Sequence, residues 1–337
     1  MQLKLPANGV ALRTVGIAVF VLLSSLPHRS SGQSGTWQPA KPVEIVIGVT
    51  PGGGIDRVAR VIQKIAQGRR LVDVPINVAN KPGGGGALAL TYLQQHAGDA
   101  HYLQITATSL LTNHIVGKSQ FSHRDFTPVV LLSDEYIGFL VREDSPLRTG
   151  RDLLNVFRNA ADSLPIGIAT AAGNTNHIAA AAAARAVGAD VKKLKVVIFG
   201  SGGEAMTALL GGHVGLVTTP VANSLAHVQA GRIRVLAVAA PQRFEGPLAA
   251  VPTWKEQNAD VVVANWRPVI GPKGLAAPQV AFWEGAFAKL TQTDDWKGEV
   301  RRDGSVAHFM GSRELAAYFD SQYAQFKSIL TDLGLAK

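Results

Sequence analysis

The pattern of apolar and polar positions predicts a strand, a glycine turn and a helix near the start of the globular part of the chain. Residues 43–49 are mostly apolar, as in a buried strand. Residues 51–54 are a proline and three glycines, and after them apolar residues recur at helical spacing from Ile55 to Ala66. The turn therefore opens an amphipathic helix.

A second unit of the same kind follows directly. Residues 74–78 have the pattern of a strand, residues 80–86 form a second glycine turn, and a helix is expected at residues 87–95. A third strand at residues 102–106 ends in a loop that carries the hydroxyl groups of Thr108 and Ser109. Two glycine turns so close together predict one shared pocket.

The rest of the chain repeats this pattern after a break. A strand at residues 136–141 precedes a change of composition at residues 142–146, where we place the crossing between two lobes. The later expected elements are strands at 165–170, 194–199, 215–219, 235–239 and 261–264, helices at 177–187 and 204–210, a loop at 266–272, and a long final helix ending near Gly334. The second series is expected to form a parallel-type sheet.

Length and composition agree with a two-lobed chain. The 337 residues are about twice a typical domain, and 47% apolar with 17% charged residues is an ordinary globular mixture. We expect two packed α/β lobes, the first made of residues 36–138 and 258–337 and the second of residues 139–257.

The N-terminal residues have the order of a secretory signal. Lys4 and Arg13 precede the apolar stretch 15–23, and a small polar tract follows at residues 30–35. The apolar stretch is too short to span a bilayer, so we expect a secretory signal peptide over residues 1–32. The alternative is a membrane anchor that stays attached.

Charge, cysteine content and histidine spacing narrow the classes of partner, cofactor and reaction that the chain can have. The net charge is +9, and removal of residues 1–32 takes away three basic residues and no acidic one, which leaves 30 − 24 = +6. The basic residues are scattered without interleaved aromatics, so nucleic acid is not expected as a partner. The absence of cysteine excludes disulfides and thiolate chemistry. The histidines lack the spacing of a metal site, and neither a metal nor a cofactor is expected.

The glycine turns are candidate anion sites. Without Cβ atoms the backbone can approach a ligand closely, and the first helical N–H groups have no partner within the helix. The alternative is a tight turn that binds nothing. A dinucleotide fingerprint is disfavoured because Arg57 stands where its third glycine belongs. No G-x-S-x-G, H-E-x-x-H or Walker motif is present, so no catalytic residue is identified.

Five side chains near the turns have two interpretations each. Asp56 either caps the first helix or points into the cleft toward a ligand group. Asn174 and Thr175 either cap the helix that they begin or donate to the ligand. His177, in the first turn of the same helix, is either a neutral donor or a packing residue. Ser201 either donates to an oxyanion or is an ordinary turn serine.

Several short motifs keep a common order from about Trp37 to Gly334. They are P-G-G-G-x-D at residues 51–56, the glycine turn at 80–86, F-T-P at 126–128, G-x-x-x-H at 173–177, L-L-G-G-x-V at 209–214, A-G-x-x-R-x-L-A-V at 230–238 and V-P-T-x-x-E at 251–256. Together they resemble the solute receptors of tripartite tricarboxylate transport systems, also called Bug-type receptors.

The chain departs from that family at several points. Residues 98–103 replace the common D-G-Y-T-L, Phe199-Gly200-Ser201 replaces Y-K-G, and Asn174 replaces the usual serine or threonine. The second change removes a phenol and an ammonium group. The sequence therefore leaves open whether this chain binds the family's usual carboxylates or other ligands.

The resemblance implies a type II periplasmic-binding-protein fold, in which two Rossmann-like α/β lobes meet at a hinge and enclose a central cleft. It also implies that the turns of both lobes grip carboxylate groups, largely through backbone N–H groups and bridging water. The residues that correspond to this site are Gly53, Gly54, Asp56, Gly84, Gly85, Gly86, Ser109, Gly173, Asn174, His177 and Ser201.

The function implied by the resemblance is that of a receptor in the periplasm of a Gram-negative bacterium, a monomer without catalytic activity. It captures a small carboxylate and hands it to a tripartite tricarboxylate membrane permease. Two alternatives remain open. One is an orphan or sensory binding protein that signals to a membrane receptor, and the other is an α/β enzyme that binds a phosphate or dinucleotide in the same turns.

Overall fold

The computed structural model describes residues 37–52, 54–302 and 304–337. The predicted signal peptide at residues 1–32 and the predicted site residue Gly53 lie outside the described residues. Within these ranges, no helix combines the length and the apolar character needed to cross a membrane.

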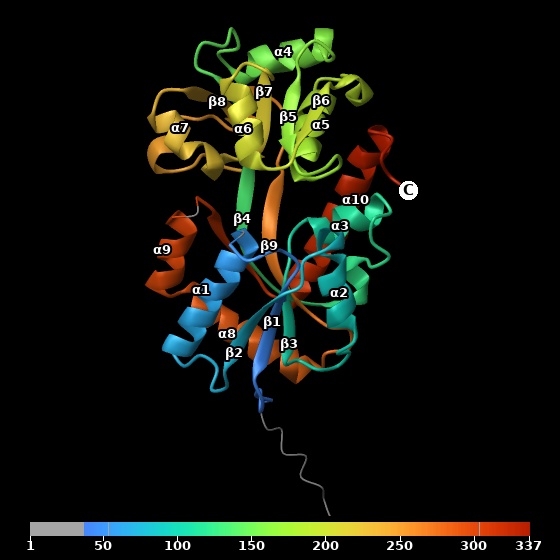
Figure 1. Cartoon of the computed structure of the whole chain (residues 1–337), viewed down its shortest axis with the longest axis vertical. Helices are drawn as coiled ribbons and strands as arrows, with labels where there is room; N and C mark the ends of the chain where they lie inside the picture. Colours follow the sequence, from blue (N-terminus) through green and yellow to red (C-terminus); the bar gives the residue numbers. More distant parts are fainter. Residues whose placement is uncertain (1–36, 53, 303) are drawn as a thin grey trace, which may run out of the picture. The chain divides into compact units, whose positions relative to one another are not determined.

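The described chain is a mixed α/β structure, as predicted, with two groups of strands that share one long strand (Figure 1). The strands are β1 (Val43–Ile47), β2 (Ile76–Asn80), β3 (Tyr102–Ile105), β4 (Thr127–Arg142), β5 (Ile166–Ala169), β6 (Val196–Phe199), β7 (Leu216–Pro220), β8 (Ile233–Val238), β9 (Ala264–Gly271) and β10 (Val306–Met310). The α-helices are α1 (Gly54–Gly68), α2 (Ala87–Gln94), α3 (Ser109–Ile115), α4 (Gly150–Ala160), α5 (Thr175–Arg185), α6 (Gly202–Leu210), α7 (Leu225–Gln229), α8 (Ala277–Thr291), α9 (Asp294–Arg302) and α10 (Ser312–Asp332).

The long strand β4 belongs to both groups of strands. Up to Tyr136 it pairs with β9, and from Ile137 onward it pairs with β7 and β8, all antiparallel. On the first side β2, β1 and β3 are parallel, and on the second side β7, β5 and β6 are parallel. We call β1–β3, β10, α1–α3 and α8–α10 the first lobe, and β5–β8 with α4–α7 the second lobe (Figure 1).

The core of the first lobe follows from the apolar pattern of its first strand and helix. Val43, Ile45, Val46 and Ile47 of β1 are at most 1% exposed, so both faces of the strand are buried. The apolar stripe of α1 packs on the same cluster as Trp283 of α8 and Trp296 of α9. This packing fixes the end of β1 and the turn that follows it.

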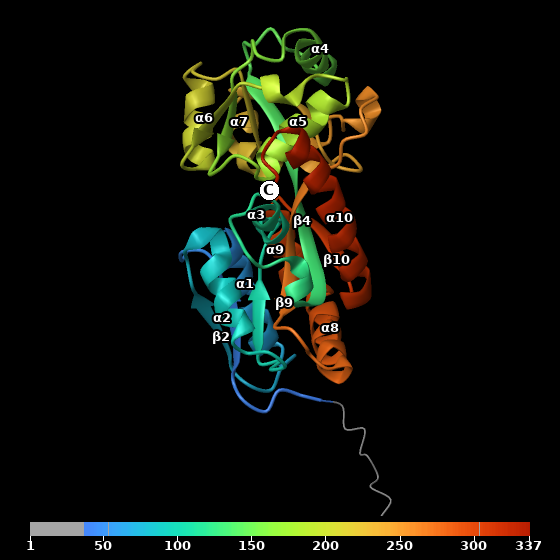
Figure 2. The same cartoon turned by 90° about the vertical axis from the view of Figure 1, so that its right-hand side faces the viewer.

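A second apolar cluster runs from the second lobe along β4 to α10. Nearly all of α5 is buried in it, because a helix made mostly of alanine can lie close to its neighbours. The last turns of α10 reach α5, where Arg185 donates to Ser328 (2.9 Å) and Asp332 (3.0 Å) (Figure 2). Helix α10 of the first lobe therefore also contacts the second lobe.

Most predicted elements are confirmed with small changes at their ends, but the strand predicted at residues 136–141 is only the last part of β4, which begins at Thr127. The loop predicted at residues 266–272 is wrong, because these residues lie mainly in β9, and of the strand predicted at 261–264 only Ala264 belongs to a strand. Arg267 and Pro268 hide the pattern of a buried strand. Arg267 is nevertheless 5% exposed, and it forms an ion pair with Glu135 of β4 that offsets the cost of burying its charge.

The parallel sheet predicted for the second lobe is correct only in part. Strands β5, β6 and β7 form it, whereas β8 pairs with β4 in antiparallel orientation. The predicted lobe boundary at residues 138 and 139 lies inside β4, close to the point where its pairing partner changes. The division of the chain at those residues stays a prediction.

Candidate functional site

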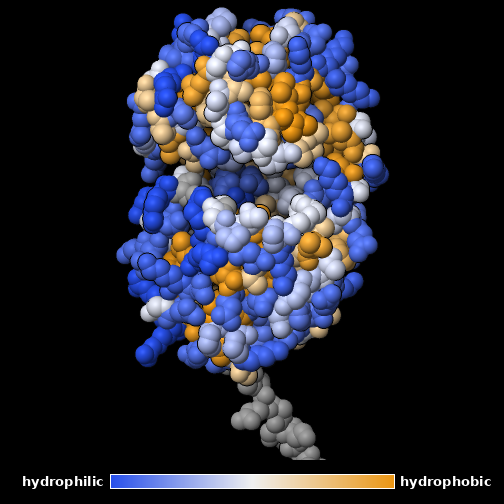
Figure 3. Space-filling view, in the orientation of Figure 1, coloured by the Kyte–Doolittle hydropathy of each residue, from blue (hydrophilic) through white to orange (hydrophobic). Residues whose placement is uncertain are grey.

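A pocket of about 540 Å³ lies between the two lobes. Figure 3 shows a hollow at this level of the molecule with a hydrophilic interior. Residues at or just beyond the carboxyl ends of β1, β3, β5 and β7 line it, namely Gly48, Ala107, Ala169 and Pro220. In open α/β sheets this edge is where ligands bind.

The turn before α2 forms one wall of the pocket. Gly84, Gly85 and Gly86 line it, and with Gly83 they form a run of four positive φ angles: 133°, 58°, 65° and 99° from Gly83 on. Only glycine adopts such a run without strain. Among the described residues, no hydrogen bond uses the N–H groups of Gly84 and Gly85.

Gly48 at the end of β1 allows this turn to approach the strand. A Cβ atom at position 48 would lie 2.7 Å from the Cα atom of Gly86, closer than side chains tolerate. On the other side, the Asn113 amide of α3 donates to the carbonyl of Gly85 at 3.0 Å. The glycine turn is therefore held between β1 and α3.

The second lobe contributes the loop from β5 to α5. Asn174 is the N-cap of α5: its side-chain oxygen accepts the N–H of His177 at 3.0 Å, and its amide donates to Ala169 and Thr170. Thr170 has a φ of 67°, a strained value for a β-branched residue, at the rim of the pocket.

The first turn of α5 offers free donors to the pocket. Thr175 and Asn176 line the pocket, and no hydrogen bond of the described chain uses their N–H groups. Such groups at a helix N-terminus carry partial positive charge.

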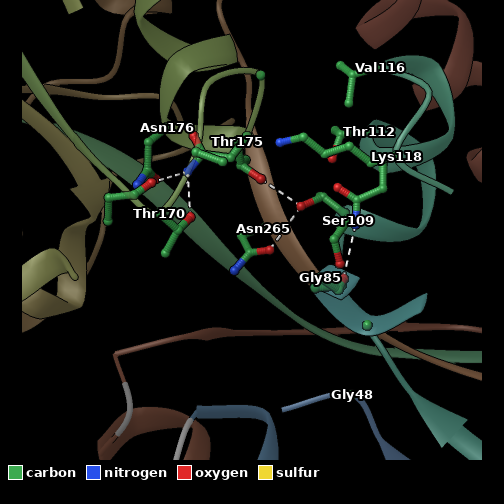
Figure 4. A pocket seen from close by; sticks show the side chains of 18 of the residues that line it. Gly48, Gly85, Ser109, Thr112, Val116, Lys118, Thr170, Thr175, Asn176 and Asn265 are labelled. Atoms are coloured by element: carbon green, nitrogen blue, oxygen red, sulfur yellow. Dashed lines mark hydrogen bonds between the residues drawn. The ribbon is translucent and has the colours of Figure 1, made fainter. Parts of the chain in front are cut away.

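Hydroxyl groups join the two lobes inside the pocket (Figure 4). Thr108 Oγ1 of the first lobe lies 2.6 Å from Thr175 Oγ1 of the second, and it donates to Asn265 Oδ1 of β9 at 3.0 Å. Since Thr108 has one hydroxyl proton, Thr175 donates to Thr108. Asn265 in turn donates to Glu135 at 3.0 Å, which connects the pocket to the ion pair between β4 and β9.

His177 does not line the pocket. The residue is 6% exposed, and its Nδ1 accepts the N–H of Gly173 at 3.1 Å. Burial lowers the pKa of His177 to about 4, so the imidazole is neutral at pH 7. The contact supports the packing interpretation of His177, because the ring fixes the turn before α5.

Asp56 also lies away from the pocket, and the interpretation that its carboxylate points into the cleft is not supported. The residue is 2% exposed, and its carboxylate accepts from Gly52 N–H (2.8 Å), Arg60 (2.9 and 3.0 Å) and Asn80 (2.9 Å). The hydrogen bonds from Arg60, with those from Gly52 and Asn80, outweigh burial and lower the pKa of Asp56 to about 2. The carboxylate ties the turn before α1 to the end of β2.

The remaining predicted residues divide between the pocket and other sites. Six line the pocket: Gly84, Gly85, Gly86, Ser109, Gly173 and Asn174. Gly54 begins α1 beside the lining residue Ile55 but is not itself part of the lining. Ser201 is the exposed N-cap of α6, where it hydrogen-bonds to Glu204.

Several lining residues were not among the residues that the resemblance places in the site: Gly48, Thr108, Thr112, Asn113, Lys118, Thr170, Thr175, Asn176 and Asn265. A sequence signal existed for Thr108, which follows a strand in a hydroxyl-bearing loop, and for Thr175, which opens a helix. None existed for Lys118 or Asn265, because their positions depend on how α3 and β9 fold.

The lining carries very little formal charge. Lys118 is the one charged side chain among the described lining residues, and none of those residues is aspartate, glutamate or histidine. In the described ranges, no group of three or more histidine, aspartate or glutamate side chains is placed to hold a metal ion.

Comparisons with known proteins agree with this geometry. Residues 58–335 match the family described as tripartite tricarboxylate transporter family receptor. A Cupriavidus necator protein, named UPF0065 protein in gbd 5'region, is 26% identical over 98% of this chain and 96% of its own length. A TctC solute-binding protein from Polaromonas, at 26% identity, has a TM-score of 0.78 over 88% of this chain and 99% of its own.

Two structures from Rhodopseudomonas palustris hold ligands. MatC with bound malate has a TM-score of 0.68 at 23% identity, over 87% of this chain and 99% of its own. Rpa4515 with adipate has a TM-score of 0.73 at 23% identity, over 88% of this chain and 99% of its own. These likenesses confirm the predicted periplasmic-binding-protein fold, and the match over residues 58–335 places the chain in the tripartite tricarboxylate transporter receptor family of solute-binding proteins.

Proposed function

We propose that this protein is a periplasmic receptor that captures a small organic anion with carboxylate groups between its two lobes and delivers it to a tripartite tricarboxylate-type permease. The observation that carries the proposal is the convergence of two sets of free backbone donors on one pocket. Gly84 and Gly85 supply them before α2, and Thr175 and Asn176 supply them at the start of α5. Helix N-termini of this kind bind anions.

The absence of acidic lining side chains supports an anionic ligand. A carboxylate side chain would repel a bound anion, and none is found among the described lining residues. Hydroxyl and amide groups of residues such as Thr112 and Asn176 can complete the hydrogen bonds of a carboxylate.

The same lining supports binding without turnover. A general base has to lie within hydrogen-bond reach of the substrate. His177, the histidine next to the pocket, is buried and accepts from Gly173, so its Nδ1 is occupied. We therefore propose a receptor rather than an enzyme.

Strands β4 and β9 connect the two lobes, and we propose that they form the hinge about which the lobes close. Strand β4 pairs with β9 in one half and with β7 in the other, and β9 runs beside it between the lobes (Figure 1). We propose that residues 36–138 with 258–337 and residues 139–257 move as two bodies about these strands, and that a ligand bound to both favours the closed form. Removal of residues 1–32 during export would place the receptor in the periplasm.

A thermal-shift screen of the mature chain tests the proposal. We expect mono-, di- or tricarboxylates to raise the melting temperature, because a ligand at about 100 times its Kd stabilises the folded state by about 2.7 kcal/mol. Amino acids, aromatic acids and nucleotides complete the panel. Stabilisation by nucleotides with no response to carboxylates would overturn the proposal in favour of an α/β enzyme.

A further inference from the structure

Lys118 occupies a defined position at the end of α3. Val116 is the C-cap, and Gly117 follows it with a φ of 72°. The N–H of Gly117 donates to His114 (3.1 Å) and the N–H of Lys118 donates to Asn113 (2.8 Å), the hydrogen-bond pattern of a Schellman motif. The left-handed glycine thus fixes the direction in which the chain leaves the helix and presents Lys118.

The Lys118 side chain extends from the α3 wall into the pocket (Figure 4). Among the described residues, no carboxylate forms an ion pair with it, whereas Lys41 elsewhere on the first lobe pairs with Asp99 at 2.8 Å. No acidic side chain of the described pocket lining therefore balances the positive charge of the Lys118 ammonium group. A bound anion is the natural source of the balancing negative charge.

Asn113 connects Lys118 to the glycine turn before α2. Asn113, whose carbonyl accepts from the Lys118 N–H, also donates through its side chain to Gly85. The pocket therefore presents backbone donors at the glycine turn and at α5, and one full positive charge on the α3 wall. Its volume of about 540 Å³ is within the range of small-ligand sites and accommodates a molecule with two separated anionic groups.

We infer that Lys118 pairs with a second carboxylate of the ligand, so that the receptor selects dicarboxylates over monocarboxylates of the same shape. The inference rests on the proposed function and names the ligand class of the same pocket. The physical reason is the strength of a charge-assisted hydrogen bond: replacing the second carboxylate by a neutral amide removes a charged partner and leaves the ammonium without one.

Titration calorimetry with matched ligands tests this inference. Succinate and adipate are compared with their monoamides, succinamate and adipic acid monoamide, which have nearly the same shape and one negative charge fewer. For the wild-type mature chain we expect the better-bound diacid to bind about 10-fold to 100-fold more tightly than its monoamide. In Lys118→Gln we expect this ratio to fall close to 1, and in Lys118→Arg we expect it to be kept in part.

Lys64→Gln is the matched control. Lys64 is exposed on α1 and is not a lining residue, so this variant loses the same charge away from the pocket. It is expected to keep the wild-type ratio. Because Lys118 is exposed as well, its variants are expected to keep the wild-type melting temperature without ligand.

The outcomes separate the two proposals. Equal binding of diacid and monoamide to the wild type, or an equal loss for both in Lys118→Gln, overturns the role of Lys118 and leaves the carboxylate receptor standing. No binding of any carboxylate in the calorimetric series or in the thermal-shift screen overturns the receptor function, and this inference with it.

Discussion

The turns before α1 and before α5 are built on one plan but serve different purposes. In each, the third residue of the helix accepts the N–H of a glycine four positions earlier: Asp56 accepts from Gly52 at 2.8 Å, and His177 accepts from Gly173 at 3.1 Å. The turn before α6 repeats the contact, with Glu204 accepting from Gly200 at 3.1 Å.

The difference between these turns is the charge of the acceptor. Asp56 and Glu204 are carboxylates, and neither they nor the glycines they hold line the pocket. The turn held by the neutral His177 does line it, through Gly173 and Asn174. A carboxylate in the first turn offsets the positive end of the helix, whereas a neutral ring leaves that end available to a bound anion. Fixing a turn and binding a ligand therefore require different acceptors.

The largest expected effect comes from placing a negative charge in the pocket turn. Gly173 has a φ of 80°, and a Cβ atom there would lie 3.3 Å from Leu330 and Val116. We expect Gly173→Asp to weaken carboxylate binding by about 1000-fold, because like charges about 4 Å apart repel by about 4 kcal/mol near a protein surface. Calorimetry on the folded variant measures the loss.

Gly173→Asn is the control for Gly173→Asp, since it has the same shape and the same backbone strain without the charge. We expect a loss of about 10-fold or less from it. Unchanged affinity in Gly173→Asp would remove this turn from the binding site, and equal losses in both variants would assign the effect to strain.

The acid sensitivity of His177 is the next effect in size. Its folded-state pKa of about 4 lies below the ordinary value of 6.5, so below pH 6.5 the unfolded chain takes up a proton that the folded chain does not. Wild-type stability is then expected to fall by about 3 kcal/mol between pH 6.5 and pH 4, relative to His177→Asn, which does not titrate. Urea unfolding at several pH values measures this, and parallel profiles would contradict it.

Asp56 is expected to affect stability and not binding. We expect Asp56→Asn to lose about 1 to 2 kcal/mol of unfolding free energy at pH 7. The folded-state pKa of about 2 lies below the ordinary value of 3.8, so this contribution is complete above about pH 4 and disappears as the pH falls toward 2. Carboxylate affinity is expected to change by less than about 3-fold. A large loss of affinity with unchanged stability would restore a ligand contact for Asp56.

The smallest effect is expected at the exposed turn before α6. Glu204→Gln keeps an oxygen that can accept the N–H of Gly200, and the turn lies outside the pocket. We expect changes below about 0.5 kcal/mol in stability and none in carboxylate affinity. A measurable drop in affinity would place the turn before α6 in the site after all.

The strand and helix units of the first lobe could be predicted from the sequence because their signals are local. The apolar run of β1, the glycine turns and the stripe of α1 are visible without knowledge of their partners. Strand β9 could not be predicted, because Arg267 is acceptable in a buried strand only when Glu135 on the neighbouring strand β4, over a hundred residues earlier, forms an ion pair with it. Long-range compensation of this kind has no local signature.

The candidate site shows the same limit. The glycine turns and the start of α5 were visible in the sequence, and both line the pocket. The sequence did not show which way Asp56 and His177 point, because each turns back to a glycine four residues earlier. A loop lysine such as Lys118 looks like any surface lysine until the end of α3 and the opposite lobe are in place.

The four consecutive glycines before α2 also limit how receptors on this scaffold can be redesigned. A turn that only glycine can form presents main-chain atoms alone, so side-chain substitution cannot alter what it recognises without deforming it. New ligand preferences have to arise on the other walls, where the side chains of Thr112, Lys118 and Asn265 line the pocket. A directed-evolution library at these three positions, with the glycines fixed, is the economical route to a receptor for a different acid.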